Sequence, residues 1–160
     1  MIEKKILIIK LSALGDIVHT LPVLRTLRQE YPKAYIAWIV EERYQELIVK
    51  NPDIDEVIPI RTKTWRKNWN VNTVREILFS IKRIRSKKFD VVLDLHGLVK
   101  SGAIALLSGA RIKAGFHKNN CKEKISSIFT NKKAPYMGDG IHIVDMYLNL
   151  IKTSLNIQKE

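Results

Sequence analysis

The stretch Ile6-Leu-Ile-Ile-Lys-Leu-Ser-Ala-Leu-Gly-Asp16 joins an apolar run to small residues, a glycine and an aspartate. The run from Ile6 to Ile9 has the length and composition of a buried β-strand, and a helical pattern follows Asp16. A segment that connects a strand to a helix in an α/β sheet lies at the carboxyl end of the strand, where ligands bind. We therefore predict a functional loop over residues 10–16, with Asp16 placed to meet a ligand.

The same alternation of strand and helix runs along the rest of the chain. We expect further strands at residues 34–40, 56–60, 90–95 and 111–116, where apolar and β-branched residues predominate. Helices are expected from about residue 17 to 31 and at residues 44–49, 74–84, 100–107 and 141–155. Strands separated by helices predict right-handed βαβ units, and hence an α/β fold with a doubly wound, Rossmann-like parallel sheet.

Three of the expected helices carry apolar residues at helical spacing, and we expect each set to form a buried stripe. The sets are Val18, Leu21, Leu24 and Leu27; Val74, Ile77, Leu78, Ile81 and Ile84; and Ile141, Val144, Tyr147, Leu148 and Ile151. Pro22 should lie in an early helical turn or at a small kink, because it has no backbone N–H to donate.

The composition is that of a globular protein. The 160 residues fit a single domain over residues 1–160, and 46% of them are hydrophobic while 28% are charged. The single Cys121 excludes an internal disulfide and a multi-cysteine metal site, which fits a reducing compartment. The amino-terminal apolar run is too short for a signal peptide, and no run approaches the ~20 residues that span a bilayer. We expect a cytoplasmic protein.

The net charge of +12 is unevenly distributed. Residues 61–133 hold 18 lysines and arginines against four acids, whereas the rest of the chain carries 10 basic and 12 acidic residues. Positive charge confined to one block favours an anionic partner over a set of separately solvated side chains.

Asp16 could act as a general base that takes a proton from an attacking hydroxyl within hydrogen-bond distance. Its alternative role is to cap the helix that follows, since an aspartate accepts amide hydrogen bonds and offsets the helix dipole. Around it Ser12, Ala13 and Gly15 leave room for a ligand, although they suit a tight turn equally well. The loop lacks the glycine patterns of dinucleotide and P-loop sites, so we expect neither.

Residues 63–69 read Lys-Thr-Trp-Arg-Lys-Asn-Trp and lie on an expected loop over residues 61–70. The cations Lys63, Arg66 and Lys67 suit carboxylates or phosphates, and the two indole faces suit sugar rings, nucleobases or a bilayer interface. The alternative is a solvated loop with one tryptophan in the core.

Asp94, His96 and Lys100 follow the expected central strand, and Gly97 allows a sharp turn between them. His96 could equally be a loop histidine bonded to the backbone. No third ligand stands at a spacing that suits zinc, so we expect no metal site. A Gly-x-Ser-x-Gly elbow is also lacking, which disfavours a serine hydrolase. The last expected loop at this edge, residues 117–124, is again basic.

Four segments, in order along nearly the whole chain, together resemble the ADP-heptose:lipopolysaccharide heptosyltransferases of glycosyltransferase family 9, most closely the heptosyltransferase I type. The segments are Lys10-Leu-Ser-Ala-Leu-Gly-Asp16-Ile-Val-His19-Thr-Leu-Pro22, Trp38-Ile-Val-Glu41-Glu42, Trp65-Arg-Lys-Asn-Trp69 and Asp94-Leu-His-Gly97-Leu-Val-Lys100-Ser101. The resemblance implies a GT-B glycosyltransferase, in which two Rossmann-like domains face each other across a cleft. This chain would be the amino-terminal, acceptor-binding half, without the donor-binding domain.

The resemblance also implies roles for particular residues. Asp16 would deprotonate a hydroxyl of Kdo on lipid A, which attacks ADP-heptose with inversion. Positions that match the family pattern would hold the acceptor's carboxylates and phosphates, with two more residues near the acceptor. The anion-holding positions are Lys63, Arg66, Lys67 and Lys122, and the other two are His96 and Lys100. Lys63 and Lys122 stand where arginine is expected, which removes bidentate pairing.

The same resemblance implies no cofactor, an ADP-heptose donor bound by the absent domain, and a peripheral position on the cytoplasmic face of the inner membrane. Two other classes remain open. A basic nucleic-acid-binding module, suggested by the charge and the tryptophan pair, predicts salt-sensitive binding to many sequences, although no recognised motif supports it. A peripheral membrane adaptor would place Trp65 and Trp69 near anionic lipid.

Overall fold

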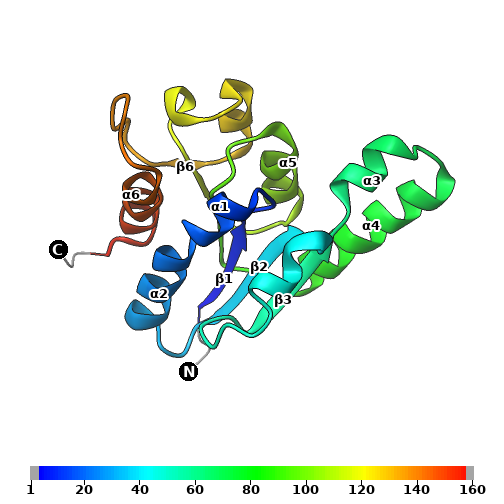
Figure 1. The fold of residues 1–160 in the computed structure, drawn as a ribbon, viewed down its shortest axis with the longest axis horizontal. Helices are drawn as coiled ribbons and strands as arrows, with labels where there is room; N and C mark the ends of the chain where they lie inside the picture. The colour runs from blue at the N-terminus through cyan, green and yellow to red at the C-terminus, as the bar shows by residue number, and fades with distance from the viewer. Residues whose placement is uncertain (1–3, 158–160) are drawn as a thin grey trace.

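Residues 4–157, which the computed structural model describes, contain six parallel strands in one sheet, in the order β3-β2-β1-β4-β5-β6 (Figure 1). The strands are β1 (Lys5–Ile9), β2 (Tyr35–Glu41), β3 (Glu56–Ile60), β4 (Val91–Asp94), β5 (Ile112–Gly115) and β6 (Lys132–Lys133). The α-helices are α1 (Leu14–Val18), α2 (Leu21–Glu30), α3 (Thr62–Lys67), α4 (Val71–Ser86), α5 (Val99–Leu107) and α6 (Ile143–Leu155). Three short 3-10 helices of the described residues are η1 (Glu42–Leu47), η2 (Lys118–Asn120) and η3 (Lys124–Phe129). The strand order is that of a doubly wound sheet, so the predicted α/β, Rossmann-like fold is confirmed.

The first predicted strand, β1, lies in the middle of the sheet. Leu7 pairs with Ala37 of β2 on one side and with Val92 of β4 on the other. Residues 6–9 are completely buried. A continuous apolar run is what a parallel strand needs when both of its faces are covered.

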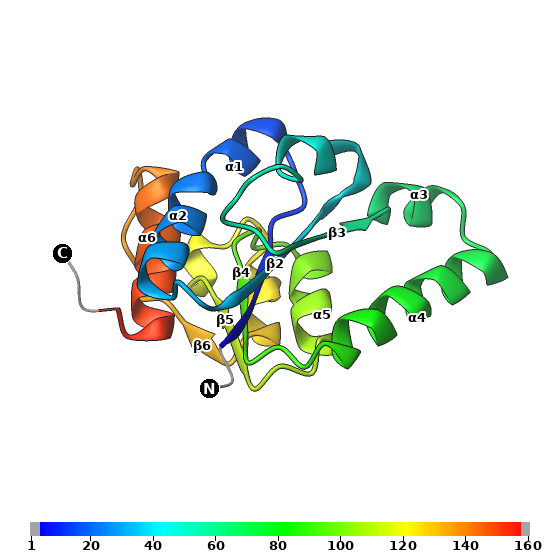
Figure 2. The ribbon, with the colours of Figure 1, turned by 90° about the horizontal axis from the view of Figure 1, so that it is seen from below.

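Helices cover both faces of the sheet (Figure 2). On one face, α2 and α6 contribute Leu27 and Tyr147 to an apolar core. On the other face, α4 and α5 contribute Ile84 and Ala105 to a second core, against which Trp65 of α3 packs. Because successive strand residues point to opposite faces, the central strands β1, β2 and β4 supply side chains to both cores.

The helix expected over residues 17–31 is instead two helices, α1 and α2, separated by residues 19 and 20. The Thr20 hydroxyl donates to the carbonyl oxygen of Asp16 at 2.8 Å. Pro22 lies in the first turn of α2, as predicted. The break leaves Val18 51% exposed, so its predicted place in the buried stripe is wrong. Two other members of that stripe are buried as predicted, Leu24 and Leu27.

The segment 61–70, expected as a loop, contains the helix α3. Its cations and tryptophans show no apolar periodicity, which is why the pattern did not indicate a helix. Trp65 packs against the core while Trp69 is 74% exposed. The alternative that one of the two tryptophans packs in the core is therefore correct for Trp65 and Trp69.

The helix α4 forms as predicted, but its apolar face is buried only near the carboxyl end. Ile84 is buried, whereas Val74 and Leu78 are 37% and 60% exposed, so the predicted buried stripe is wrong for these two. The reason is visible in Figures 1 and 2: α3 and the amino-terminal half of α4 extend away from the sheet, past α5. We call this projection the α3–α4 arm.

The last helix, α6, forms as predicted but begins at Ile143 and not at residue 141. Tyr147 and Ile151 of α6 are buried, but Ile141 precedes the helix and is 38% exposed, so its predicted burial is wrong. The elements β6 and η3 were not predicted. No helix in residues 4–157 has both the length and the apolar composition needed to cross a membrane.

Candidate functional site at the carboxyl edge of the sheet

The sheet has a switch point between β1 and β4. The chain leaves β1 toward the face covered by α2, and leaves β4 toward the face covered by α5. In open parallel sheets, ligands bind at such a point, outside the carboxyl ends of the strands. Residues 10–16 and 95–100 follow these two strands there, and residues 116–123 follow the neighbouring β5.

Asp16 is the third residue of α1, not a loop residue as expected. Its Oδ2 accepts a hydrogen bond from Nζ of Lys122 at 2.9 Å and lies 3.8 Å from Nζ of Lys10. The Ala13 backbone N–H is a further donor to the carboxylate, a contact typical of the third residue of a helix. Helix capping is therefore part of what Asp16 does. Its side chain remains 26% exposed, so a ligand can reach it.

The protonation state of Asp16 is set by its cationic neighbours. Burial alone would raise its pKa, but the hydrogen bond from Lys122 and the charge of Lys10 outweigh burial and hold the pKa below its ordinary value. Asp16 is therefore ionised at neutral pH, the state that a general base requires. Its proton affinity is low while both cations stay in place, so its strength as a base depends on where the two ammonium groups lie.

Lys10 is completely buried beneath the site. Its Nζ donates to the carbonyl oxygen of Leu95 at 2.9 Å and to the hydroxyl of Tyr147 at 2.6 Å, and lies 4.9 Å from the centre of the Tyr147 ring. Desolvation lowers its pKa to about 8, although the charge of Asp16 opposes this shift. Lys10 therefore remains mostly charged at neutral pH, stabilised by oxygen acceptors and an aromatic face.

Asp94 shapes the turn after β4. Its Oδ1 accepts backbone hydrogen bonds from His96 at 3.0 Å and from Gly97 at 3.2 Å. Burial raises the pKa of Asp94 despite these bonds. Gly97 has a φ of +69°, in the left-handed region that favours glycine, so the chain turns sharply at this point.

The His96 side chain lies beneath this turn and is 3% exposed as a residue. Neither ring nitrogen has a hydrogen-bond partner among the described residues, so the alternative of a histidine whose ring bonds to the backbone does not hold. Burial lowers its pKa to about 3, and the charges of Lys10, Lys100 and Lys122 act in the same direction. The ring is therefore neutral, and it lies within reach of the cations on both sides of the site.

Lys122 reaches Asp16 because the segment after β5 is attached to the turn after β4. The Glu123 N–H donates to the Gly97 carbonyl oxygen at 3.1 Å, and the Glu123 carboxylate accepts from the Val99 N–H at 2.6 Å. A Cβ on Gly97 would lie 3.5 Å from the backbone nitrogen of Lys122. These contacts bring a half-exposed ammonium group to a carboxylate 106 residues away in sequence.

A second group of cations lines a hollow of about 90 Å³ beside the first. Lys63 and Arg66 of α3 and Lys100 of α5 surround it, together with Thr62. The Lys100 ammonium donates to the Thr62 hydroxyl at 3.4 Å, and this hydroxyl donates to the Glu41 carboxylate. Burial lowers the pKa of Lys100; Glu41 opposes the shift, and Lys63 and Arg66 reinforce it. No ion pair within residues 4–157 neutralises these three cations, so the hollow suits an anion.

The structure does not bring every predicted residue into these groups. Lys67, at the carboxyl end of α3, is exposed and does not line the hollow. Ser12 and Ala13 lie between β1 and α1 and are joined by a cis peptide bond. Gly15 lies inside α1, where a Cβ would meet nothing within 4 Å, so its missing side chain leaves open space beside Asp16.

The sequence did not indicate that Lys10 or Tyr147 belongs to the site. Lys10 directly follows a buried apolar strand, and this position could have indicated a buried cation that needs hydrogen-bond partners. Tyr147 carried no such signal, since it falls on the apolar stripe of α6 like its neighbours. Burial raises the pKa of its hydroxyl, which therefore stays protonated.

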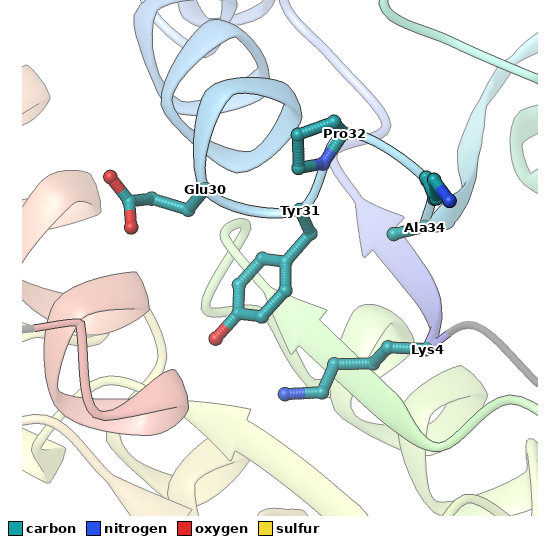
Figure 3. A pocket seen from close by; sticks show the side chains of 6 residues that line it. Lys4, Glu30, Tyr31, Pro32 and Ala34 are labelled. Carbon is teal, nitrogen blue, oxygen red and sulfur yellow. The ribbon is translucent and has the colours of Figure 1, made fainter. Parts of the chain in front are cut away.

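Two further hollows in the described residues lie at the opposite edge of the sheet. One, of about 340 Å³, lies between Lys4 and the end of α2 (Figure 3). There the Lys4 Nζ is 4.4 Å from the centre of the Tyr31 ring, whose hydroxyl donates to the Leu155 carbonyl oxygen at 3.1 Å. The other, of about 460 Å³, is lined by Asp90 and Arg111 among others. Neither contains a predicted site residue, and residues 4–157 hold no group of three or more His, Cys, Asp or Glu able to bind a metal.

A doubly wound parallel sheet with an ionised carboxylate and lysines at its switch point defines a class: the α/β domains whose candidate ligand site lies at the carboxyl edge of the strands. The family model described as glycosyltransferase family 9 (heptosyltransferase) matches residues 77–160, which is more than half of the chain. The chain belongs to this family. The resemblance noted in the sequence segments is thereby confirmed.

Relatives of known name agree with this assignment. Lipopolysaccharide heptosyltransferase 1 of Salmonella typhimurium is 31% identical over 156 residues, which are 97% of this chain and 49% of that protein. The Escherichia coli K12 protein of the same name is 30% identical over the same shares. The chain thus spans about half the length of these relatives.

Solved structures show the same relation. The E. coli heptosyltransferase WaaC with ADP superimposes with a TM-score of 0.88 at 31% identity, covering 98% of this chain and 49% of that chain. A glycosyltransferase family 9 structure from Veillonella parvula gives 0.76 at 27% identity, with 94% and 40% covered. The fold is therefore that of about half of a GT-B glycosyltransferase.

Proposed function

We propose that this chain is the acceptor-binding part of an inverting lipopolysaccharide heptosyltransferase, which transfers heptose from ADP-heptose to Kdo of the lipid A inner core. The observation that carries this function is the ionised, accessible carboxylate of Asp16 at the switch point, with cations beside it. Similarity to lipopolysaccharide heptosyltransferase 1, and to WaaC solved with ADP, supports it. A second domain would bind the donor, and the reaction would need no metal or organic cofactor.

In this function Asp16 is the general base. The Kdo hydroxyl oxygen forms a bond to the anomeric carbon of heptose, and its proton passes to the Asp16 carboxylate. The bond between that carbon and the ADP oxygen breaks, and ADP leaves with the electron pair. Attack from the face opposite the leaving group inverts the anomeric centre. The acceptor must hold its hydroxyl within about 3 Å of the carboxylate for the proton to move.

Lys122 would couple acceptor binding to the strength of this base. Its side chain is 51% exposed and is able to turn from Asp16 toward a carboxylate of the acceptor. When it turns, the pKa of Asp16 rises because a main cause of its lowering is removed. The carboxylate would then become a better proton acceptor at the moment the acceptor is bound.

The remaining cations would hold the acceptor's anionic groups. Lys63, Arg66 and Lys100 surround one hollow, so a single phosphate or carboxylate can contact all three. Lys67 would add attraction from the exposed end of α3. His96 would contribute a neutral ring near both groups of cations, positioned by the loop and not by hydrogen bonds of its own ring.

We also infer a peripheral position on the cytoplasmic face of the inner membrane, because the proposed acceptor is a membrane lipid. The positive charge of residues 61–133 supports this location, since anionic headgroups attract basic surfaces.

Two measurements test the function. The chain alone should bind a Kdo-bearing glycolipid. When a donor-binding domain of the family completes the chain, it should transfer labelled heptose from ADP-heptose. Asp16→Asn should reduce transfer by about 100-fold or more while leaving acceptor affinity nearly unchanged, because an amide cannot take the proton.

The matched control is Asp145→Asn, which removes an exposed carboxylate on α6 and should leave both measurements unchanged. Undiminished transfer by Asp16→Asn would exclude the general-base role. A chain that does not bind the glycolipid would exclude the acceptor-binding role.

A further inference from the structure

An apolar groove of about 230 Å³ lies between α4 and α5, where the α3–α4 arm leaves the body of the molecule. Trp65 of α3, Ile77 and Ile81 of α4, and Ala103 and Ile104 of α5 contribute to its walls. Figure 2 shows α4 leaving the side of α5 toward the tip of the arm. The two helices therefore do not close over these side chains as core helices would.

The apolar side chains of the groove are not fully covered by other side chains of the described residues. Ile77 and Ile81 stay only partly buried, and the exposed Val74 and Leu78 extend the same side of α4 beyond the groove. Side chains in protein cores are normally packed without such gaps, and contiguous exposed apolar side chains are a feature of binding surfaces. The Trp65 indole N–H is buried without a hydrogen-bond partner in residues 4–157, so no hydrogen bond fixes its ring.

The groove joins the cationic hollow described above. Thr62 and Lys100 line both of them. One end of the apolar groove therefore opens at the hollow where Lys63, Arg66 and Lys100 form no ion pair within the described residues. A molecule that fills both spaces needs an apolar chain and an anionic group within a few ångströms of each other.

We propose that the groove binds a fatty acyl chain of the lipid acceptor, while an anionic group of the same molecule lies on Lys63, Arg66 and Lys100. The groove is smaller than the roughly 300–1,000 Å³ of sites that enclose whole small ligands, so it holds part of a larger molecule. Charge complementarity at its end selects an amphiphile with a phosphate or carboxylate. The ligand's identity as an acceptor rests on the proposed function, whereas the groove's affinity for acyl chains does not.

This binding would also orient the acceptor. The acyl chain would lie at the base of the arm and the anion in the adjoining hollow. The charges of Lys100, which lines the hollow, and of Lys122, which contacts Asp16, both lower the pKa of His96, so the hollow and Asp16 lie near the same buried ring. The sugar of the same molecule would extend from the hollow toward Asp16.

A series of alkyl phosphates tests the groove without any sugar donor. Butyl, octyl and dodecyl phosphate, all below their micelle concentrations, and inorganic phosphate are titrated into the chain by calorimetry. Affinity should rise by up to about fourfold per added methylene until the groove is full, because each buried methylene adds a similar increment. In parallel NMR spectra the Trp65 indole signal should shift. The Trp38 indole, which donates to the Lys10 carbonyl oxygen at 3.0 Å, should not shift.

Matched variants locate the binding. Ala103→Phe fills the groove and should weaken dodecyl phosphate binding by about tenfold or more, with little effect on inorganic phosphate. Leu106→Phe, on the same helix but outside the groove, should change neither. Lys100→Gln should weaken every phosphate by about tenfold, whereas Lys82→Gln on the exposed side of α4 should have a much smaller effect.

The outcomes separate this inference from the proposed function. Equal affinities for butyl and dodecyl phosphate would overturn the proposed acyl-chain binding even if heptose transfer occurs. Equal losses of dodecyl phosphate affinity in Ala103→Phe and Leu106→Phe would do the same. Chain-length-dependent binding without heptose transfer would support the groove and contradict the proposed function. Because the chain-length series uses the unchanged protein, it decides the question even if Ala103→Phe does not fold.

Discussion

Lys10 carries an ammonium group in a place that is closed to water, and its charge there depends on a few fixed partners. The Leu95 carbonyl, the Tyr147 hydroxyl and the Asp16 carboxylate face it. Desolvation lowers the pKa of Lys10, and the charges of Asp16 and Asp94 oppose this shift, so the pKa falls to about 8 and not further. The charge that holds Asp16 in its ionised form is thus itself sensitive to pH.

The stability of the protein should reflect this buried lysine. Its pKa is about 8 when folded and 10.5 ordinarily, so between these values the unfolded chain binds the additional proton. Stability contributed by Lys10 therefore rises as pH increases through this window. We expect the unfolding free energy of the natural chain, minus that of Lys10→Met, to increase by about 2 to 3 kcal/mol between about pH 7 and about pH 10.

Denaturant unfolding of both proteins at the two pH values measures this difference. Lys4→Met, which removes a cation from the opposite edge of the sheet, serves as the control and should show no comparable change. A difference that is flat or falls with pH would mean that Lys10 does not titrate in this window.

Lys122 should control the acidity of Asp16. Lys122→Met removes the hydrogen bond and charge that lower this pKa, so the carboxyl pKa of Asp16 should move upward. Carbon-detected NMR titration of the Asp16 carboxyl group measures it directly. Lys118→Met, an exposed cation on η2, should leave the titration unchanged. An unshifted pKa in Lys122→Met would remove the proposed coupling between acceptor binding and base strength.

At the level of elements, local pattern predicted the strands far better than the helices near the site. The strand expected at 56–60 forms over those residues. Runs of β-branched residues favour buried strands, so this signal is visible in the local sequence. The helix α3 was missed because its cations and indoles follow no apolar period. The break between α1 and α2 was missed because the Thr20 side chain, not a glycine or proline, completes the turn.

The packing of η3 against α5 depends on Gly102. A Cβ at this position would lie 2.7 Å from the Phe129 ring, so Phe129 must move to admit one. We expect Gly102→Ala to lower the unfolding free energy by about 1 to 3 kcal/mol, since overpacking displaces neighbouring groups. Gly15→Ala is the control: it meets nothing within 4 Å and should not destabilise the chain in the same denaturant titrations. Equal effects of the two substitutions would show that the close approach of Gly102 to Phe129 does not affect the unfolding free energy.

The α3–α4 arm should open before the rest of the molecule. Residues 71–80 of α4 include the exposed Val71, Val74 and Leu78, whereas the strand β4 is buried along its whole length. Few buried contacts imply a low free energy of local opening. In hydrogen exchange, amides of residues 75–80 should therefore exchange faster than those of β4. Equal protection would indicate that the arm is held as firmly as the sheet.

For the molecule as a whole, the site could be predicted only in part, because its members are far apart in sequence. Asp16 was singled out from the strand-to-helix pattern around it. Lys122 was singled out only through resemblance to a family, since no local pattern connects residues 106 positions apart. Lys10 and Tyr147 are 137 positions apart and were not connected at all. Charge counting did indicate an anionic ligand, because clustering of like charge is visible in the sequence itself.

The uneven charge of the chain should produce selective binding to anions, not general attraction. If the cations of the site recognise a shaped acceptor, the chain should bind a Kdo-bearing glycolipid by at least roughly tenfold more tightly than single-stranded DNA at physiological salt. Raising the salt concentration should weaken DNA binding more steeply than glycolipid binding, because DNA binding rests on counterion release. Tighter binding to DNA would favour the nucleic-acid-binding alternative.

The hydrogen bond between Lys10 and Tyr147 also constrains how the protein is made. Lys10, which follows the central strand β1, is synthesised before α6, so it acquires this partner only when α6 has been made. Until then the ammonium group lacks one of the acceptors that make its burial tolerable. The carboxyl edge of the sheet around Lys10 therefore cannot form completely until α6 is available, and it should be one of the last regions of the domain to fold during translation.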